Sequence, residues 1–150
     1  VFTRRQVNIE SINASASSIE GVHKYTITTW SDEEQVKTIT KQIEKKIDVV
    51  KATHFTDDEL FIRETGLYKL ATEKVLGNPE ISRIIRKQEA IITEVNPTYV
   101  IVMKSGLTED IMNLFYALNE FDCVLQYTRS GRIAVTRSTT EEVSKYLEQR

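Results

Sequence analysis

The chain has 150 residues, 28% of them charged, with 20 Lys and Arg against 22 Asp and Glu and a formal net charge of −2. A chain of this length buries about 68–70% of its unfolded surface, which suffices for one compact domain or two small ones. The mixed charge excludes a general binding surface for nucleic acid or an anionic membrane. With one cysteine, no internal disulfide and no run of 18 apolar residues, we expect a cytoplasmic protein.

The beginning of the chain is typical of a helix that ends and turns into a strand. Two apolar residues are followed at once by Arg4 and Arg5, and cations suit a helix C-terminus. Contact with a partner subunit is the alternative role for these two arginines. The β-favouring runs at residues 8–16 and 22–30 flank a small, polar stretch, and together they predict a hairpin with a mobile tip.

A helix is predicted next, because Asp32 and Gln35 have the spacing of a capping box. Apolar residues recur along one helical face, at Val36, Ile39, Ile43 and Ile47. Residues 48–52 then resume a β-like run. The visible order of helix, strand, strand, helix, strand matches a ferredoxin-like βαββαβ unit that lacks its first strand in this chain. We expect about 20–25 preceding residues to supply that strand, its turn and half a helix.

The pattern restarts after an acidic connector at residues 54–58. Residues 60–71 alternate as a strand, and Asn78 followed by Pro79 predicts the start of a helix. The remaining predicted elements are strands at 91–95 and 99–104, a helix capped by Thr108, strands at 124–128 and 132–136 around a Ser130–Gly131 turn, and a final helix from Thr139. The sequence therefore predicts an α+β protein with two tandem ferredoxin-like units, at residues 1–56 and 57–150.

The sequence offers no constellation of residues that is typical of catalysis. His23 and His54 lack neighbours at metal-ligand spacing, and the five glycines are isolated, so no phosphate-binding loop is predicted. Cys123 enters an apolar strand, where a small buried side chain is the usual role. Three of the four pairs of adjacent acids fall in predicted first helical turns, where they stabilise the helix dipole. We therefore predict no catalytic residue, metal site or cofactor in this chain.

Asn8 is a polar residue with two possible roles. Its side-chain amide has donors and an acceptor, so it can hold the carboxylate and ammonium of an amino acid where the chain leaves a helix for a strand. The alternative is a structural asparagine that tolerates a left-handed conformation at the same exit. The residues alone favour the structural role.

Four segments resemble the regulatory small subunit of acetolactate synthase (acetohydroxyacid synthase). Residues 5–12 are similar to the family's run Arg-Gly-aromatic-Asn-Ile-Glu-Ser-Leu, and residues 39–51 to its helix and following strand with Lys-Gln before Ile-Asp-Val. Residues 63–70 resemble its Arg-Glu-Leu-x-Leu-x-Lys-Val strand, and residues 129–137 its closing Arg-x-Gly-x-x-Ala-x-x-Arg segment. The four matches follow one another in the family's order across nearly the whole chain.

The resemblance implies that the first unit is an ACT domain, which pairs in a homodimer and binds a branched-chain amino acid, usually valine, between two copies. Direct matching assigns Asn8 and Ile9 to the effector site, with Ala14 and Ser15 on the same strand as weaker assignments. The implied partner is a large catalytic subunit that carries thiamine diphosphate, Mg²⁺ and FAD. This chain would activate that subunit and confer feedback inhibition by valine or a related amino acid in branched-chain amino-acid biosynthesis.

Readings from other classes remain as alternatives. A free-standing amino-acid-binding ACT module that regulates another enzyme is the first, and the family-like second unit argues against it. An RNA-binding module of the same topology would need paired aromatics on adjacent strands and a basic face, which Tyr25, Trp30 and the net charge do not supply. A small enzyme is the last, because no candidate site supports it.

Overall fold

The computed structural model describes residues 1–2 and 7–139, so the predicted helix end around Arg4 and Arg5 and the final helix lie outside the described residues. The chain forms two compact units, one of Val1–Ile62 with the segment that begins at Arg132, the other of Arg63–Gly131. The division into domains 1–56 and 57–150 stays a prediction.

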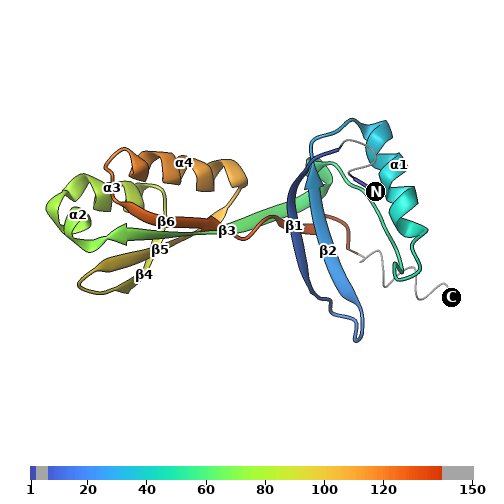
Figure 1. The fold of residues 1–150 in the computed structure, drawn as a ribbon, viewed down its shortest axis with the longest axis horizontal. Coiled ribbons are helices and arrows are strands. Elements are labelled where there is room, and N and C mark those ends of the chain that lie inside the picture. The colour runs from blue at the N-terminus through green and yellow to red at the C-terminus, as the bar shows by residue number, and fades with distance from the viewer. Residues whose placement is uncertain (3–6, 140–150) are drawn as a thin grey trace. The chain divides into compact units, whose positions relative to one another are not determined.

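The first unit contains the predicted hairpin and helix (Figure 1). Strands β1 (Ile9–Ala16) and β2 (His23–Thr29) pair antiparallel in a two-stranded sheet. Helix α1 (Glu33–Glu44) begins as predicted, because Asp32 accepts a hydrogen bond from the backbone N–H of Gln35 at 2.8 Å. Ile39 on its inner face is 4% exposed.

The strand predicted at residues 48–52 is wrong, since these residues form turns and irregular structure. Helix α1 ends at Glu44, one turn earlier than the apolar pattern suggested, and Ile47 is fully exposed. The Glu44 carboxylate accepts the backbone N–H of Ala52 at 3.3 Å and forms an ion pair with Lys51 at 3.1 Å. A strand needs a neighbouring strand to bind its backbone N–H and C=O groups. Within the described part of this unit, residues 48–52 contact the Glu44 side chain instead.

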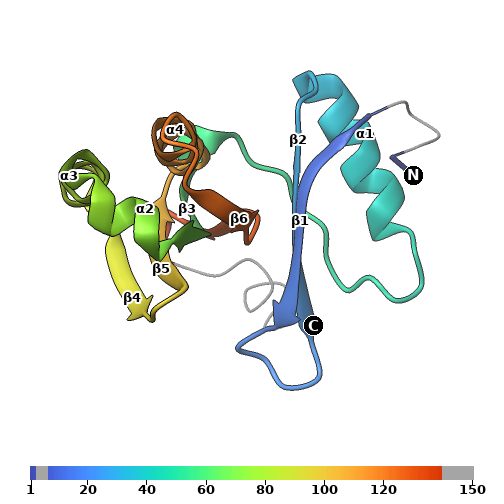
Figure 2. The same ribbon diagram turned by 60° about the vertical axis from the view of Figure 1, so that its left-hand side comes forward.

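The second unit confirms the predicted ferredoxin-like order of elements (Figures 1 and 2). A short 3₁₀ turn of the first unit, η1 (Asp57–Glu59), leads into strand β3 (Leu60–Ala71), which enters the second unit at Arg63. Helices α2 (Thr72–Gly77) and α3 (Pro79–Lys87) come next. Strands β4 (Ile91–Val95) and β5 (Tyr99–Gly106), helix α4 (Thr108–Asn119) and strand β6 (Val124–Arg129) complete the second unit. The last described strand, β7 (Ile133–Thr136), belongs to the segment grouped with the first unit. The sheet order is β4-β5-β3-β6, and β7 also pairs with β3.

Local capping explains where the helices of this unit begin. The Asn78 side chain accepts the backbone N–H of Glu80 at 3.0 Å, with Pro79 in the first turn, as predicted. The cap predicted at Thr108 is wrong: Leu107 precedes the helix without a side-chain cap, and the Thr108 hydroxyl donates to Glu64 at 2.7 Å. A hydroxyl bound to a buried carboxylate is not available to the helix end.

The predicted Ser130–Gly131 hairpin turn is also wrong. Strands β6 and β7 both pair with β3 rather than with each other. Between them the Ser130 N–H donates to the Thr65 carbonyl at 2.9 Å, and Gly131 has φ +82°. Gly131 therefore lies in the break between β6 and β7, where the backbone has a positive φ that other residues rarely adopt.

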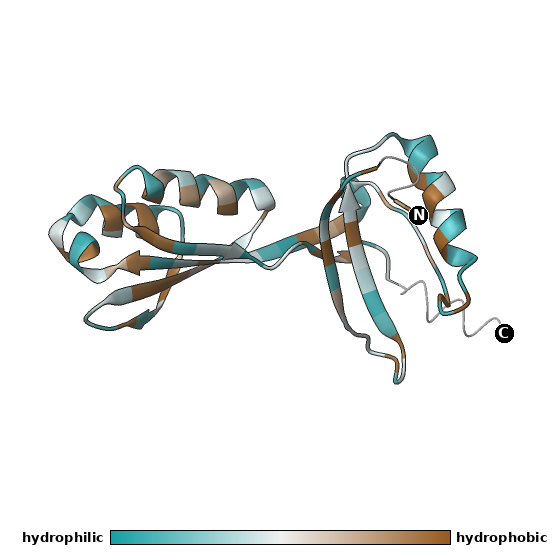
Figure 3. Cartoon of the chain, in the orientation of Figure 1, coloured by the Kyte–Doolittle hydropathy of each residue, from teal (hydrophilic) through white to brown (hydrophobic). Residues whose placement is uncertain are grey.

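The core of the second unit lies between its sheet and its helices. Tyr68, Leu70 and Val102 on the strands are fully buried against Ile111 and Leu114 of α4. The other main members are Val75, Ile81, Ile85, Val100, Leu118 and Cys123. The hydropathy colouring of Figure 3 shows the apolar residues of this unit on its strands and on one side of its helices. This alternation follows the sequence pattern from which the strands and helices were predicted.

Gly66 is expected to tolerate no larger residue. A Cβ at this position would lie 2.6 Å from Cγ2 of Ile111 and 3.0 Å from the Tyr68 hydroxyl, so Gly66→Ala should lower the free energy of unfolding by about 1–3 kcal/mol through overpacking. Gly77→Ala is the matched control, because nothing lies within 4 Å of its added Cβ, and it should be neutral or stabilising. Denaturant titration measures both. Equal stability of the two variants would contradict the packing described here.

Cys123 is expected to react slowly with alkylating reagents. Its side chain is 1% exposed, its Sγ donates to the Leu118 carbonyl at 3.2 Å, and burial raises the pKa of the thiol. Since the thiolate is the nucleophile, iodoacetamide should modify the native protein far more slowly than the urea-unfolded protein at the same pH. Similar rates in the two states would show that the thiol is accessible.

Candidate effector site

The residues assigned to the effector site by resemblance all lie on or next to β1. Asn8 is exposed and directly precedes the strand, and Ile9 begins it with 43% of its surface exposed. Val7, just before them, is 7% exposed, and its N–H donates to the Phe2 carbonyl at 3.0 Å. A buried Val7 thus anchors the chain where Asn8 enters the strand.

Ala14 and Ser15 lie near the other end of β1. Both are exposed, and they pair with Tyr25 and Lys24 of β2. With a rise of about 3.3 Å per residue, Ile9 and Ala14 are about 17 Å apart along the strand. One amino acid cannot touch both ends, so within a single chain the structure does not bring these four residues together.

The outer edge of β1 is available for pairing. Within the described residues β1 pairs with β2 alone, so one row of its backbone N–H and C=O groups has no strand beside it. Pairing is irregular between Ile9 and Ser11, where a bulge shifts the register. An edge of this kind is a ready template for another strand.

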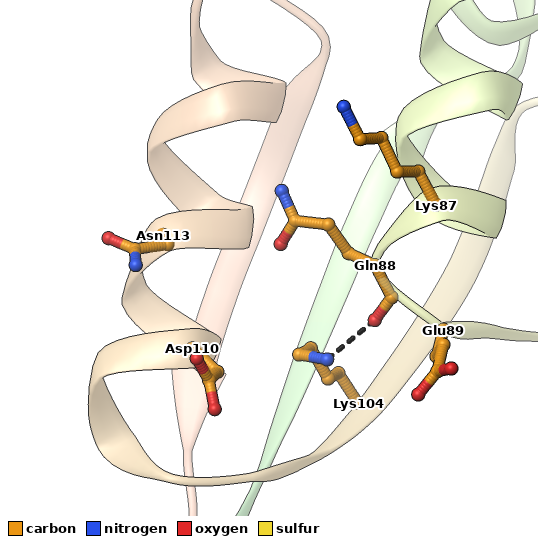
Figure 4. Close-up of a pocket in the computed structure, with 6 residues that line it drawn as sticks. All are labelled: Lys87, Gln88, Glu89, Lys104, Asp110 and Asn113. Carbon is orange, nitrogen blue, oxygen red and sulfur yellow. Dashed lines mark hydrogen bonds between the residues drawn. The ribbon is translucent and has the colours of Figure 1, made fainter.

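The structure adds a hollow that sequence reasoning missed, in the second unit between the end of α3, β5 and the start of α4 (Figure 4). It has a volume of about 400 Å³ and is lined by polar and charged residues, Lys87, Gln88, Glu89, Lys104, Asp110 and Asn113. The Lys104 ammonium donates to the Gln88 carbonyl at 2.5 Å, which satisfies a free carbonyl at the end of α3. No pattern along the chain joins residues from three separate elements.

The buried charged residue of the second unit is Glu64, on the helix-covered side of β3. Its carboxylate is 3% exposed, accepts the Thr108 hydroxyl at 2.7 Å, and lies 3.5 Å from Nη1 of Arg129. The second contact is an ion pair rather than a hydrogen bond, because the oxygen facing Arg129 makes no hydrogen bond. This network ties β3 to β6 and to the first residue of α4.

The described residues include no group of three or more His, Cys, Asp and Glu side chains placed to hold a metal ion. No helix among the described residues is long and apolar enough to cross a membrane.

Comparisons of the sequence with known proteins all match it to acetolactate synthase small subunits. A family model described as the small subunit of acetolactate synthase matches residues 63–138. The acetolactate synthase small subunit of Bacillus subtilis is 30% identical over 145 residues, covering 96% of this chain and 83% of that protein. That of Haemophilus influenzae is 29% identical over 139 residues, covering 91% and 83%.

A solved structure extends the agreement to the fold. The crystal structure of an acetolactate synthase small subunit from Thermotoga maritima matches with a TM-score of 0.80 and 25% identity, covering 93% of this chain and 86% of that one. The sequence matches and the fold thus cover both units. The chain belongs to the acetolactate synthase small-subunit family.

Proposed function

We propose that this chain is the regulatory subunit of an acetolactate synthase, that it activates a separate catalytic subunit, and that it confers feedback inhibition by valine or a related branched-chain amino acid. Family membership across both units carries the proposal. Thiamine diphosphate, Mg²⁺ and FAD belong to the catalytic partner. The alternative of a free-standing ACT module is disfavoured because the family match includes residues 63–138.

The geometry of β1 supports an effector site that is shared between two copies. If β1 pairs antiparallel with β1 of a second copy through its open edge, one register places Asn8 opposite Ser15 and Ile9 opposite Ala14. Residues that lie about 17 Å apart in one chain are then adjacent across the two-fold axis. The pairing forms two equivalent sites per dimer.

The chemistry of these residues suits an aliphatic amino acid. The Asn8 amide can donate to a carboxylate and accept from an ammonium group, while Ile9 supplies an exposed apolar surface beside it. Ala14 and Ser15 are small, so a branched side chain has room on the facing strand. An effector held by two chains stabilises their association and can shift the equilibrium of the bound catalytic subunit by about 1–3 kcal/mol, or 5–150-fold.

Calorimetry with the full chain and valine tests the effector part of the proposal. We expect one valine per chain, and a dimer dissociation constant that falls as valine is added, because binding to a shared site must favour the dimer. Binding that leaves the dimer dissociation constant unchanged would contradict a shared site. Glycine is the matched control ligand, since it has the same charged groups without the branched side chain.

The subunit part of the proposal is tested by size-exclusion chromatography of this chain with the acetolactate synthase catalytic subunit from the same source. We expect the two proteins to elute together ahead of either alone. Separate elution at concentrations well above those used for activity would contradict a role as the small subunit of that enzyme.

A further inference from the structure

An amino-acid effector brings a carboxylate into its site, and the residues assigned to that site carry no positive charge. The four assigned residues are all uncharged: Asn8, Ile9, Ala14 and Ser15. Taking a carboxylate out of water costs free energy unless a cation or hydrogen-bond donors replace the water. These four residues therefore leave the effector carboxylate without a counter-charge.

Lys24 of β2 is a cation directly beside Ser15 of β1. The two residues are paired in the antiparallel register of the hairpin. Directly paired residues point to the same face of a sheet, with Cβ atoms about 4.5–5.5 Å apart, so the Lys24 side chain leaves the sheet next to that of Ser15. Its four-carbon stem is longer than the strand spacing of about 4.8 Å. The ammonium can therefore reach over Ser15 toward a strand on the far side of β1.

One hydrogen bond holds the Lys24 ammonium and leaves it donors for an anion. Nζ donates to the Ala134 carbonyl of β7 at 3.1 Å, and β7 belongs to the same unit as β1 and β2. An ammonium has three N–H donors. Among the described residues no carboxylate forms an ion pair with Lys24, and the residue is exposed. A neutral carbonyl thus positions a cation whose charge the described residues do not neutralise.

We propose that Lys24 of one copy binds the carboxylate of the effector, beside Asn8 of the other copy. This inference rests on the proposed function, because it places the ligand in the site shared by two β1 strands. In the register that sets Asn8 opposite Ser15, three neighbouring strands carry Asn8, Ser15 and Lys24 side by side over about 10 Å. An amino acid that lies over Ser15 then has its carboxylate within reach of the Lys24 ammonium and its amino group within reach of the Asn8 amide oxygen.

This role makes Lys24 a specificity-determining residue, because it distinguishes ligands by their carboxylate. A hydrogen bond between two charged groups is roughly twice as strong as one between neutral groups. Valinamide keeps the ammonium and the branched side chain of valine and replaces the carboxylate by a neutral amide, so the chain should prefer valine to valinamide. A lysine that served only to hold Ala134 would affect the binding of the two ligands equally.

Calorimetry of the full chain with valine and with valinamide tests this role. The wild-type chain should bind valine at least about tenfold more tightly than valinamide. Lys24→Met keeps the stem and removes the ammonium, so it should reduce this preference about tenfold, mainly by weakening valine binding. Lys24→Arg retains a cation and should keep most of the preference. Lys41→Met is the matched control, because it removes the same charge from an exposed position on α1 and should change neither affinity.

The outcomes separate this inference from the proposed function. A wild-type chain that binds valine, with the same preference in Lys24→Met, would overturn the role of Lys24 and leave the proposed function in place. Equal weakening of valine and valinamide in Lys24→Met would also overturn it, because that is the result of a structural lysine. A wild-type chain that binds no valine would contradict the proposed effector, and the role of Lys24 with it. Circular dichroism confirms that each variant remains folded.

Discussion

Replacing Glu64 by alanine is expected to lower the free energy of unfolding of the second unit by about 3 kcal/mol. The substitution removes a carboxylate that is 3% exposed and leaves Arg129 and the Thr108 hydroxyl without their shared partner. The effect falls at the low end of the range for broken buried pairs, because the Arg129 side chain keeps 30% of its surface exposed and stays partly solvated. Denaturant titration monitored by tyrosine fluorescence measures the change.

Two variants separate the parts of this effect. Glu64→Gln keeps an oxygen that can accept the Thr108 hydroxyl and removes the charge, so it should lower the free energy of unfolding less than Glu64→Ala does. Glu80→Ala breaks the exposed ion pair between Glu80 and Arg83, whose side chains are 51% and 68% exposed, respectively. It should lower the free energy of unfolding by at most about 1 kcal/mol. If Glu64→Ala were no more destabilising than Glu80→Ala, the buried network would not stabilise this unit as described.

Asn8→Ala is expected to weaken the response of the reconstituted enzyme to valine by about 10- to 150-fold in effector concentration. The estimate corresponds to the loss of hydrogen bonds to charged groups, about 1.5–3 kcal/mol. Because Asn8 is exposed and precedes β1, stability and activation of the catalytic subunit should change little. The measurement is the valine concentration that gives half-maximal inhibition of acetolactate formation.

Asn113→Ala is the matched control for this prediction. It removes the same side chain from an exposed position on α4 of the second unit and should leave the valine response unchanged. An Asn8→Ala enzyme with the normal valine response would contradict the effector role of Asn8 and favour its structural role at the strand entry.

Local signals allowed much of the fold to be predicted from the sequence. The side chains of Asp32 and Asn78 each accept a backbone N–H within three residues, so their helix starts depend on neighbours along the chain. Strand β3 has the predicted bounds because its alternation continues over 12 residues. The same alternation also places the buried Glu64 on the inward side of β3, between Ile62 and Gly66.

The errors arose where distant contacts decide the structure. Residues 48–52 favour β structure, yet a strand requires a neighbour, and Glu44 binds this segment from the end of α1. The Ser130–Gly131 pair has the composition of a hairpin turn, but both flanking strands pair with β3. Thr108 is a good helix cap by type, and only the fold places Glu64 within reach of its hydroxyl.

In the candidate effector site, too, local signals were visible in the sequence and distant relations were not. Asn8 stood out from the residues alone as an amide at a strand entry, while only the family resemblance favoured an effector role over a structural one. Its relation to Ala14 and Ser15 could not be inferred from spacing, because these residues lie at opposite ends of β1 and the proposed register between two copies is what would join them.

The most direct measurement is the rate of acetolactate formation by the catalytic subunit from the same source, alone and with this chain, each with and without valine. We predict that the chain raises the rate and that valine lowers the raised rate while it leaves the catalytic subunit alone almost unaffected. A rate that does not respond to the chain would contradict its proposed role as the regulatory subunit of that enzyme.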